Sequence, residues 1–154
     1  MEHYYTNNPT TESREKIINS TIANENLKFY TDNGVFSKES VDFGTKTMLE
    51  SFTTNKENAK VADIGCGYGV ISIFLAKKYP TYKFTMVDVN NRVLELSKKN
   101  IELNKIENEV EVLESSSFDN VVGTFDIVLT NPPIRAGKKI VHKIMTDSYE
   151  HLNA

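Results

Sequence analysis

The chain is poor in the residues that build cross-linked, metal-rich or membrane-spanning proteins. Its 154 residues include one cysteine, three histidines, four prolines and no tryptophan. A single cysteine excludes an internal disulfide, and no histidine lies near it in the sequence, so Cys66 is interpreted as a small buried spacer. No apolar run is long enough to span a bilayer, and residues 1–5 lack the basic and apolar regions of a signal peptide. We therefore expect a cytoplasmic protein with no metal and no membrane partner.

The chain also lacks an excess of positive charge. Its formal net charge is −3, so no overall positive field draws it onto phosphate, and any contact with nucleic acid must be local. The best local cluster is Arg135, Lys138, Lys139, His142 and Lys143. On a helix, Lys139 and Lys143 would share one face at i,i+4 spacing. A solvated helix face explains the same pattern without a ligand.

A glycine-rich turn is the first motif that indicates a ligand. The apolar stretch 61–64 is followed by Gly65-Cys66-Gly67-Tyr68-Gly69 and by a helical pattern that ends near Pro80. Glycines at alternate positions let the backbone approach a ligand closely, and the helix that follows presents free amides to an anionic group. Asp88 ends the next predicted strand, about 20 residues on, where an acid can bind both hydroxyls of a ribose.

Two details of this turn disfavour a nicotinamide or flavin dinucleotide. Val70 takes the place of the third small residue in that fingerprint, and Asp63 would repel a pyrophosphate. The same acid suits a ligand with a cationic amine. Ribose, a carboxylate and a cationic amine occur together in S-adenosylmethionine. The alternatives are a tight strand–helix turn with a surface acid downstream, or a dehydrogenase, which NAD binding would reveal.

A second motif, Asn131-Pro132-Pro133-Ile134, follows the apolar run 125–130. Proline donates no backbone hydrogen bond and holds φ near −65°, so the chain leaves the strand stiffly at this point. The Asn131 side-chain oxygen and the carbonyls of Asn131 and Pro132 form a set of fixed acceptors that can bind both hydrogens of a planar amine. Asn131 and Pro132 are therefore the predicted catalytic residues. A simple turn after a strand is the alternative.

These segments together resemble the successive motifs of class I methyltransferases, and more narrowly the RsmC-like ribosomal RNA guanine-N2 methyltransferase family. The resemblance is carried by residues 63–69, 87–90 and 131–138, and it extends to Gly34-Val35-Phe36-Ser37 and to residues 41–45. It covers the chain from about His3 onward. The combination is much more specific than any one motif.

The resemblance implies a site in which S-adenosylmethionine is the cofactor. The implied cofactor contacts are Phe36, Asp63, Gly65, Cys66, Gly67, Gly69, Asp88, Val89, Ser116 and Asn131. The implied substrate contacts are Pro133, Ile134, Arg135, Lys138 and Lys139. Two departures from the family pattern stand out. The chain reads Ser116 where many relatives carry an acid, and Ile134 where many amino-methyltransferases carry a stacking aromatic, so the stacking partner is unidentified, with Phe36 as one possibility.

The implied reaction is transfer of a methyl group to an exocyclic amine, with guanine N2 of ribosomal RNA as the first choice. A base inside a duplex is unreachable, so the guanine must be single-stranded or flipped out. One alternative is methylation of a glutamine amide in a protein, which uses a similar Asn-Pro-Pro turn. The other is a cofactor-binding fragment without turnover.

The expected fold is α/β, a Rossmann-like doubly wound parallel sheet in a single domain of residues 1–154. Strands are predicted at 61–64, 83–88, 110–112 and 125–130, and helices after the first two strands and after residue 137. Residues 1–36 are expected to hold a small hairpin, with its turn at Asp32-Asn33-Gly34 and its second strand at Val35-Phe36. Ser37 is the expected cap of a helix with Val41, Met48, Leu49 and Phe52 on its apolar face.

The sequence ends where the family continues with three more strands and at least one helix. We therefore expect a C-terminally truncated methyltransferase. In the family strand order 3-2-1-4-5-7-6, residues 125–130 would then form an exposed apolar edge, which favours self-association.

Overall fold

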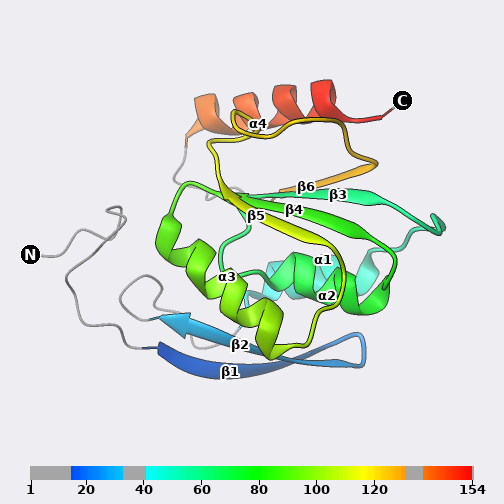
Figure 1. The fold of residues 1–154 in the computed structure, drawn as a ribbon, viewed down its shortest axis with the longest axis vertical. Coiled ribbons are helices and arrows are strands. Elements are labelled where there is room, and N and C mark those ends of the chain that lie inside the picture. Colours follow the sequence, from blue (N-terminus) through cyan, green and yellow to red (C-terminus); the bar gives the residue numbers. More distant parts are fainter. Residues whose placement is uncertain (1–14, 33–40, 131–136, 154) are drawn as a thin grey trace, which may run out of the picture.

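The structure, a computed structural model, describes residues 15–32, 41–130 and 137–153. Its elements are β1 (Glu15–Ile22), β2 (Glu25–Asp32), α1 (Phe43–Ser51), β3 (Lys60–Ile64), α2 (Val70–Lys78), β4 (Lys83–Asp88), α3 (Asn91–Leu103), β5 (Val110–Glu114), β6 (Ile127–Thr130) and α4 (Lys138–His151). Four parallel strands form a sheet in the order β5-β4-β3-β6, and β1 and β2 form a separate antiparallel pair. Helices α1 to α3 cover one face of the sheet and α4 covers the other (Figure 1). The predicted doubly wound architecture is confirmed.

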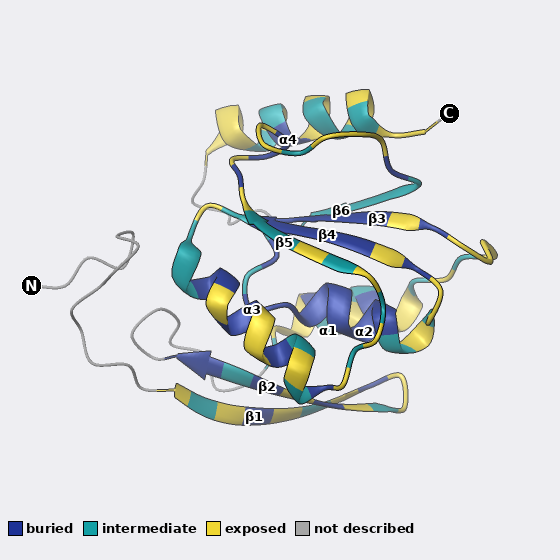
Figure 2. Ribbon diagram, viewed as in Figure 1, coloured by how far each residue is buried: buried dark blue, intermediate teal, exposed yellow. Residues whose placement is uncertain are grey.

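The two central strands are apolar on both faces because helices cover both. Val61, Ala62 and Ile64 on β3 and Met86 and Val87 on β4 are at most 2% exposed. A parallel sheet buried on both sides reads as a near-continuous hydrophobic run, which is the pattern of both strands. Helix α2 is buried almost throughout, from Val70 to Ala76, and lies at the centre of the larger core. Figure 2 shows this concentration of buried residues in β3, β4 and α2.

The hairpin lies at a different place from the one predicted. β2 pairs along its whole length with β1, from Glu15↔Asp32 to Ile22↔Glu25, and the turn is at Ala23 and Asn24. Both turn residues have positive φ, 46° and 70°, which two-residue hairpin turns require. The prediction placed the turn at Asp32-Asn33-Gly34, because a glycine is the stronger local signal. The proposed strand at Val35-Phe36 lies outside the described residues.

Two asparagines, Asn100 of α3 and Asn104, the residue at the carboxyl-terminal cap of that helix, bind the free edge of β2. The Asn100 side chain accepts from Tyr30 N at 2.6 Å and donates to Tyr30 O at 3.1 Å. One turn later, Asn104 does the same for Lys28, at 3.1 and 2.7 Å. The i,i+4 spacing on the helix matches the i,i+2 spacing of outward-facing groups on the strand. These side-chain amides therefore satisfy backbone N–H and C=O groups of β2 that a neighbouring strand would otherwise bind, and they attach β2 to α3.

Helix α1 starts later than predicted, and its cap is Asp42. The Asp42 carboxylate accepts a hydrogen bond from Thr45 N at 3.1 Å, and the helix begins at Phe43. The predicted cap, Ser37, lies outside the described residues. Leu49 is fully buried, and Val41, Met48 and Phe52 pack against the core as predicted. Helix α3 is capped by Asn90, whose side chain accepts hydrogen bonds from Arg92 N and Val93 N.

The edge strand β6 is shorter than predicted and is partly covered. Phe125 is fully buried and bridges in parallel to Leu152, with hydrogen bonds from Phe125 N to His151 O and from Asn153 N to Phe125 O. The prediction of an exposed edge is therefore wrong at Phe125. Ile127–Thr130 are half-buried. Within the described residues, no helix has the length and apolarity needed to cross a membrane.

Candidate functional site

The glycine-rich turn lies at the carboxyl end of β3, where ligands bind in open α/β sheets. The amides of Gly65 and Cys66 both donate to Val87 O at 2.9 Å, so the turn is attached to β4. Gly69 has a φ of +104°, and a Cβ there would lie 3.1 Å from Ile73 Cδ1 and 3.3 Å from Met86 Cε. At Gly67, with a φ of +56°, a Cβ would meet nothing within 4 Å. The turn is therefore tightly packed on its inner side and open at Gly67, as a backbone that a ligand approaches should be.

Asp88 is held beside this turn at the end of β4. Its carboxylate accepts hydrogen bonds from Gly67 N at 3.0 Å and from Asn90 N at 3.1 Å. Partial burial raises the pKa of Asp88 and these backbone amides lower it, with burial the larger effect. Each carboxylate oxygen has further acceptor capacity. The geometry fits the predicted role, in which Asp88 binds the two hydroxyls of a ribose.

Asp63, the acid at the start of the motif, is more deeply buried than a direct ligand contact would suggest. Its side chain is 0% exposed, and Ser72 Oγ on α2 donates to its Oδ2 at 2.7 Å. Its Oδ1 has no hydrogen-bond partner among the described residues. Burial is the main reason that the pKa of Asp63 rises from 3.8 to about 6. One oxygen is therefore fixed by α2, and the other is a buried acceptor whose hydrogen-bonding capacity is unused among the described residues.

Cys66 is a buried spacer, as its flanking glycines suggested. It is 8% exposed, its Sγ lies 3.9 Å from Ser97 Oγ, and burial raises the pKa of its thiol well above the usual value. A protonated, buried thiol is a poor nucleophile. Ser97 itself donates to Gly67 O at 2.6 Å. The Cys66 backbone is part of the turn itself, since its amide donates to Val87 O at 2.9 Å and its carbonyl accepts from Gly69 N at 3.0 Å; its contact with the cofactor remains a prediction.

Two of the predicted cofactor contacts, Val89 and Ser116, lie just after the ends of β4 and β5. Val89 follows Asp88 and is 62% exposed, an unusual exposure for valine beside a buried strand. Ser116 is exposed in the loop after β5, and its carbonyl accepts from Asp119 N at 3.1 Å. Since β4 and β5 are paired through Asp88↔Glu114, Val89 and Ser116 lie at the carboxyl end of the sheet, as the glycine turn does. The acid that many relatives carry at this position is replaced by Ser116.

The strand that leads to the Asn-Pro-Pro motif is the direct neighbour of the cofactor strand. In the β3–β6 register Ile64 pairs with Thr130, so Thr130 ends level with the residue before Gly65. The next residue in the sequence is Asn131. Phe36 and residues 131–135, which include Asn131, Pro132, Pro133, Ile134 and Arg135, lie outside the described residues, so their predicted roles remain predictions. The register therefore places Thr130, the residue before the motif, beside the start of the glycine-rich turn.

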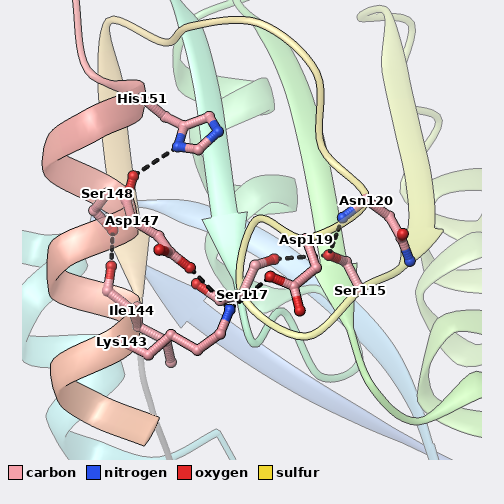
Figure 3. A network of polar contacts seen from close by, with 9 residues as sticks. All are labelled: Ser115, Ser117, Asp119, Asn120, Lys143, Ile144, Asp147, Ser148 and His151. Carbon is pink, nitrogen blue, oxygen red and sulfur yellow. Dashed lines mark hydrogen bonds and ion pairs between the residues drawn. The ribbon is translucent and has the colours of Figure 1, made fainter.

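The basic residues of α4 divide into two groups. Lys138 and Lys139 lie in its first turn and are exposed. Lys143 instead pairs with Asp119 at 2.6 Å and with Asp147 at 3.0 Å. Figure 3 shows Lys143 reaching from α4 to the loop after β5, where Ser115 also binds Ser117 O and Asn120 N. Lys143 therefore connects α4 to this loop. Among the described residues, Lys138 and Lys139 are the exposed cations nearest to the motif in the sequence.

Several residues that shape the site were missed in the sequence analysis. Ser72 fixes Asp63, Ser97 fixes Gly67, and Asn100 Nδ2 donates to Tyr68 O at 2.8 Å. All three are buried polar residues on the apolar faces of helices α2 and α3. Ser97 and Asn100 were visible as polar residues on the apolar face of α3, a pattern that indicates a buried hydrogen-bonding role.

Comparison with known proteins connects this site to one family. The sequence profile described as methyltransferase small domain matches residues 26–154. The uncharacterized protein YbxB of Bacillus subtilis is 44% identical over 155 residues, which cover 99% of this chain and 77% of that protein. Ribosomal RNA small subunit methyltransferase C of Haemophilus influenzae is 36% identical over 133 residues, 84% of this chain and 39% of that protein.

A solved structure matches the fold over almost the whole chain. The T. thermophilus 16S rRNA N2 methyltransferase RsmC, in complex with AdoMet and guanosine, has a TM-score of 0.79 and covers 94% of this chain and 41% of that one. Its sequence identity is 22%, so the match concerns the fold. This chain spans about two fifths of the length of these methyltransferases.

Proposed function

Because this chain belongs to the methyltransferase small domain family, we propose that it transfers a methyl group from S-adenosylmethionine to guanine N2 of ribosomal RNA. The observation that carries the proposal is the β3–β6 register, in which Ile64 pairs with Thr130. This register brings the carboxyl end of the cofactor strand and the strand before Asn131 to the same point. The RsmC-type relatives, which act on ribosomal RNA by name, favour RNA as the substrate.

S-adenosylmethionine supplies an electrophilic methyl group on a sulfonium, so the protein mainly has to align cofactor and nucleophile. Asp88, already positioned by the amides of Gly67 and Asn90, binds the ribose hydroxyls. The open backbone at Gly67 would allow close approach, and the free amides at the amino-terminal end of α2 would hold the carboxylate of the methionine portion. The free oxygen of Asp63 suits the cationic amine, while Ser72 holds the other oxygen.

The predicted role of Asn131 and Pro132 is to prepare the amine. An exocyclic amine is a poor nucleophile because its lone pair is delocalised into the ring. Hydrogen bonds from its two N–H groups to the Asn131 side chain and the Pro132 carbonyl favour a pyramidal nitrogen whose lone pair is directed at the methyl. The same acceptors stabilise the positive charge that develops on that nitrogen.

RNA is favoured over protein by the charges beside the motif. Lys138 and Lys139 are exposed at the start of α4, immediately after residues 131–136, where they can contact phosphates next to the target base. Because the overall charge is −3, this contact is local, and the salt dependence of binding should be shallow because only a few cations contribute to it. Arg135 is the third cation proposed for this contact.

The test is a labelled-methyl assay on separated macromolecules. The chain is incubated with radiolabelled S-adenosylmethionine and ribosomal subunits that have not been methylated, and RNA and protein fractions are counted. Label in the RNA supports the proposal. Label in a protein fraction, released as methylglutamine, would support the glutamine alternative. If neither fraction is labelled and the chain still binds S-adenosylhomocysteine, the result would support the alternative of a cofactor-binding fragment without turnover.

A further inference from the structure

Asn100 connects two parts of the molecule that are far apart in the sequence. Its side chain is fully buried on α3. Its Oδ1 accepts from Tyr30 N at 2.6 Å, and its Nδ2 donates both to Tyr30 O at 3.1 Å and to Tyr68 O at 2.8 Å. Tyr30 belongs to β2, and Tyr68 belongs to the glycine-rich turn. The hairpin strand and the turn are therefore attached to the same amide group.

This amide group cannot serve one partner without the other. A side-chain amide has two N–H donors, and here one binds the strand and the other binds the turn. Rotation of the Asn100 side chain to follow one partner would break the bond to the other. In a buried site, a carbonyl that loses its partner costs free energy comparable to the lost hydrogen bond. A shift of Tyr30 is therefore transmitted to Tyr68.

A second contact joins the same strand to the same turn residue. The ring of Phe29, next to Tyr30 on β2, meets the ring of Tyr68 edge to face, with centroids 5.8 Å apart and an interplanar angle of 64°. Phe29 is fully buried and Tyr68 is 7% exposed. Aromatic pairs prefer this arrangement. The docked strand thus determines the position of Tyr68 through its carbonyl and through its ring.

The Tyr68 carbonyl fixes more of the turn than one atom. The peptide between Tyr68 and Gly69 is planar, so its N–H is directed opposite to its C=O. That N–H donates to Cys66 O at 3.0 Å and closes the turn. Gly69 O then accepts from Ile73 N at 3.0 Å, as the first bond of α2. Asn100 thereby supports the start of α2, whose first amides have no partner within the helix and can bind an anionic group.

Asn104 shows what attachment of the strand alone looks like. Its Oδ1 accepts from Lys28 N at 3.1 Å, and its Nδ2 donates to Lys28 O at 2.7 Å and to Asn100 O at 2.8 Å. It is 8% exposed. Asn104 and Asn100 therefore bind the same strand with the same groups. They differ in the third bond, which Asn104 makes to α3 itself and Asn100 makes to the turn.

We propose that Asn100 is a positioning residue for S-adenosylmethionine: it holds the glycine-rich turn in the geometry that binds the cofactor, and it makes that geometry depend on the docked hairpin. The inference rests on the part of the proposed function that places the cofactor at this turn, and it is independent of the RNA substrate. The β1–β2 hairpin would then support the cofactor site through α3.

The first test compares Asn100→Leu with Asn104→Leu. Each variant loses three side-chain hydrogen bonds, so both should lower the urea midpoint of unfolding by a similar amount. Calorimetry at a temperature at which both are folded measures the Kd of S-adenosylhomocysteine. We expect this Kd to rise roughly tenfold for Asn100→Leu, about the effect of one buried hydrogen bond, and to stay unchanged for Asn104→Leu.

Two results of this comparison overturn the inference alone. One is an equal Kd for wild type and Asn100→Leu, and the other is an equal rise of Kd in both variants, which would show a general effect of lower stability. A wild-type chain that does not bind S-adenosylhomocysteine would instead contradict the proposed cofactor site, and the inference with it.

Hydrogen exchange of the wild-type chain decides the question even if Asn100→Leu does not fold. Exchange of the Tyr30 amide requires its release from Asn100 Oδ1, and exchange of the Lys28 amide requires its release from Asn104 Oδ1. Because coupling between two sites is reciprocal, saturating S-adenosylhomocysteine should slow exchange at Tyr30 more than at Lys28. Equal slowing at both amides would show only general stabilisation of the fold. Equal slowing, or no slowing at Tyr30, overturns the inference.

Discussion

The two faces of the sheet are built differently. Helices α1 to α3 and the β1–β2 hairpin enclose the larger core, in which Phe29, Phe74 and Leu75 are fully buried. On the other face, α4 and the loop after β5 form a small cluster around Phe118, Phe125 and Ile144. Ile144 is the one buried residue of α4.

In the proposed function, the face with the larger core holds the cofactor and the face with α4 contacts the substrate. The glycine turn, Asp63 and Asp88 are supported by buried strands and by side chains of α2 and α3, which provide a preorganised site. The exposed residues of α4 include Ile140 at 49% and Met145 at 64%. A surface with few buried contacts opens locally at low free energy, which suits the region proposed to contact RNA.

The largest expected difference between the two faces is in stability. Phe74→Ala removes a fully buried ring from the larger core and should lower the free energy of unfolding by about 3–5 kcal/mol. Met145→Ala, on the exposed side of α4, should change it by less than about 0.5 kcal/mol. Urea denaturation followed by circular dichroism measures both. Similar losses for the two variants would show that the faces contribute equally.

A second prediction concerns the buried acid of the cofactor face. The pKa of Asp63 is about 6 in the folded chain and 3.8 in the reference state, so its stabilising contribution is complete below pH 3.8 and is lost as the pH rises to about 6. At 1.36 kcal/mol per unit, burying the charged form costs roughly 3 kcal/mol at pH 7.5. Asp63→Asn should therefore be more stable than wild type at pH 7.5, with a difference that shrinks toward pH 4.

The same variant should bind S-adenosylhomocysteine more weakly, because a neutral amide replaces the carboxylate proposed for the cationic amine. Thermal unfolding across pH measures the stability difference between Asp63→Asn and wild type, and calorimetry measures their affinities for S-adenosylhomocysteine. A variant that gains stability and keeps full affinity would place Asp63 in the core only.

A smaller effect is expected at the ribose. Asp88→Ala should weaken S-adenosylhomocysteine binding by roughly 1–3 kcal/mol, since charge-assisted hydrogen bonds are lost. Glu114→Ala is the matched control, because Glu114 pairs with Asp88 in the β4–β5 register and is exposed. Calorimetry with equal affinities for wild type and Asp88→Ala would reject this placement of the ribose.

The smallest effect is expected at the edge of the sheet. We propose that the half-buried edge strand β6 permits weak self-association, and that its amides exchange faster than those of β3. Hydrogen exchange should show strong protection at Val61–Ile64 and weak protection at Ile127–Thr130, and sedimentation should show mass that rises with concentration. Uniform protection in a monomer at all concentrations would mean that this edge is closed.

The sequence predicted the structure correctly where the local residue pattern agrees with the position of the segment in the fold. The order of strands and helices after residue 60, the glycine turn and Asp88 could all be predicted, because buried parallel strands and capped helices have strong patterns. The hairpin was misplaced, since Asn33-Gly34 is a stronger turn signal than Ala23-Asn24, and the register that pairs Glu15 with Asp32 follows from the position of the turn. The asparagines that bind β2 were missed because their partners are 70 or more residues away.

Asn131 provides the most direct test of the central claim, that the turn after β6 is the reaction centre beside the cofactor turn. The kcat of methyl transfer and the Kd of S-adenosylhomocysteine should be measured for wild type and Asn131→Ala. The account predicts a fall in kcat of about a hundredfold with cofactor affinity nearly unchanged, because the hydrogen bonds of Asn131 strengthen only as the nitrogen becomes pyramidal. Near-normal turnover in Asn131→Ala would contradict it, and Asn131 would then only shape the turn.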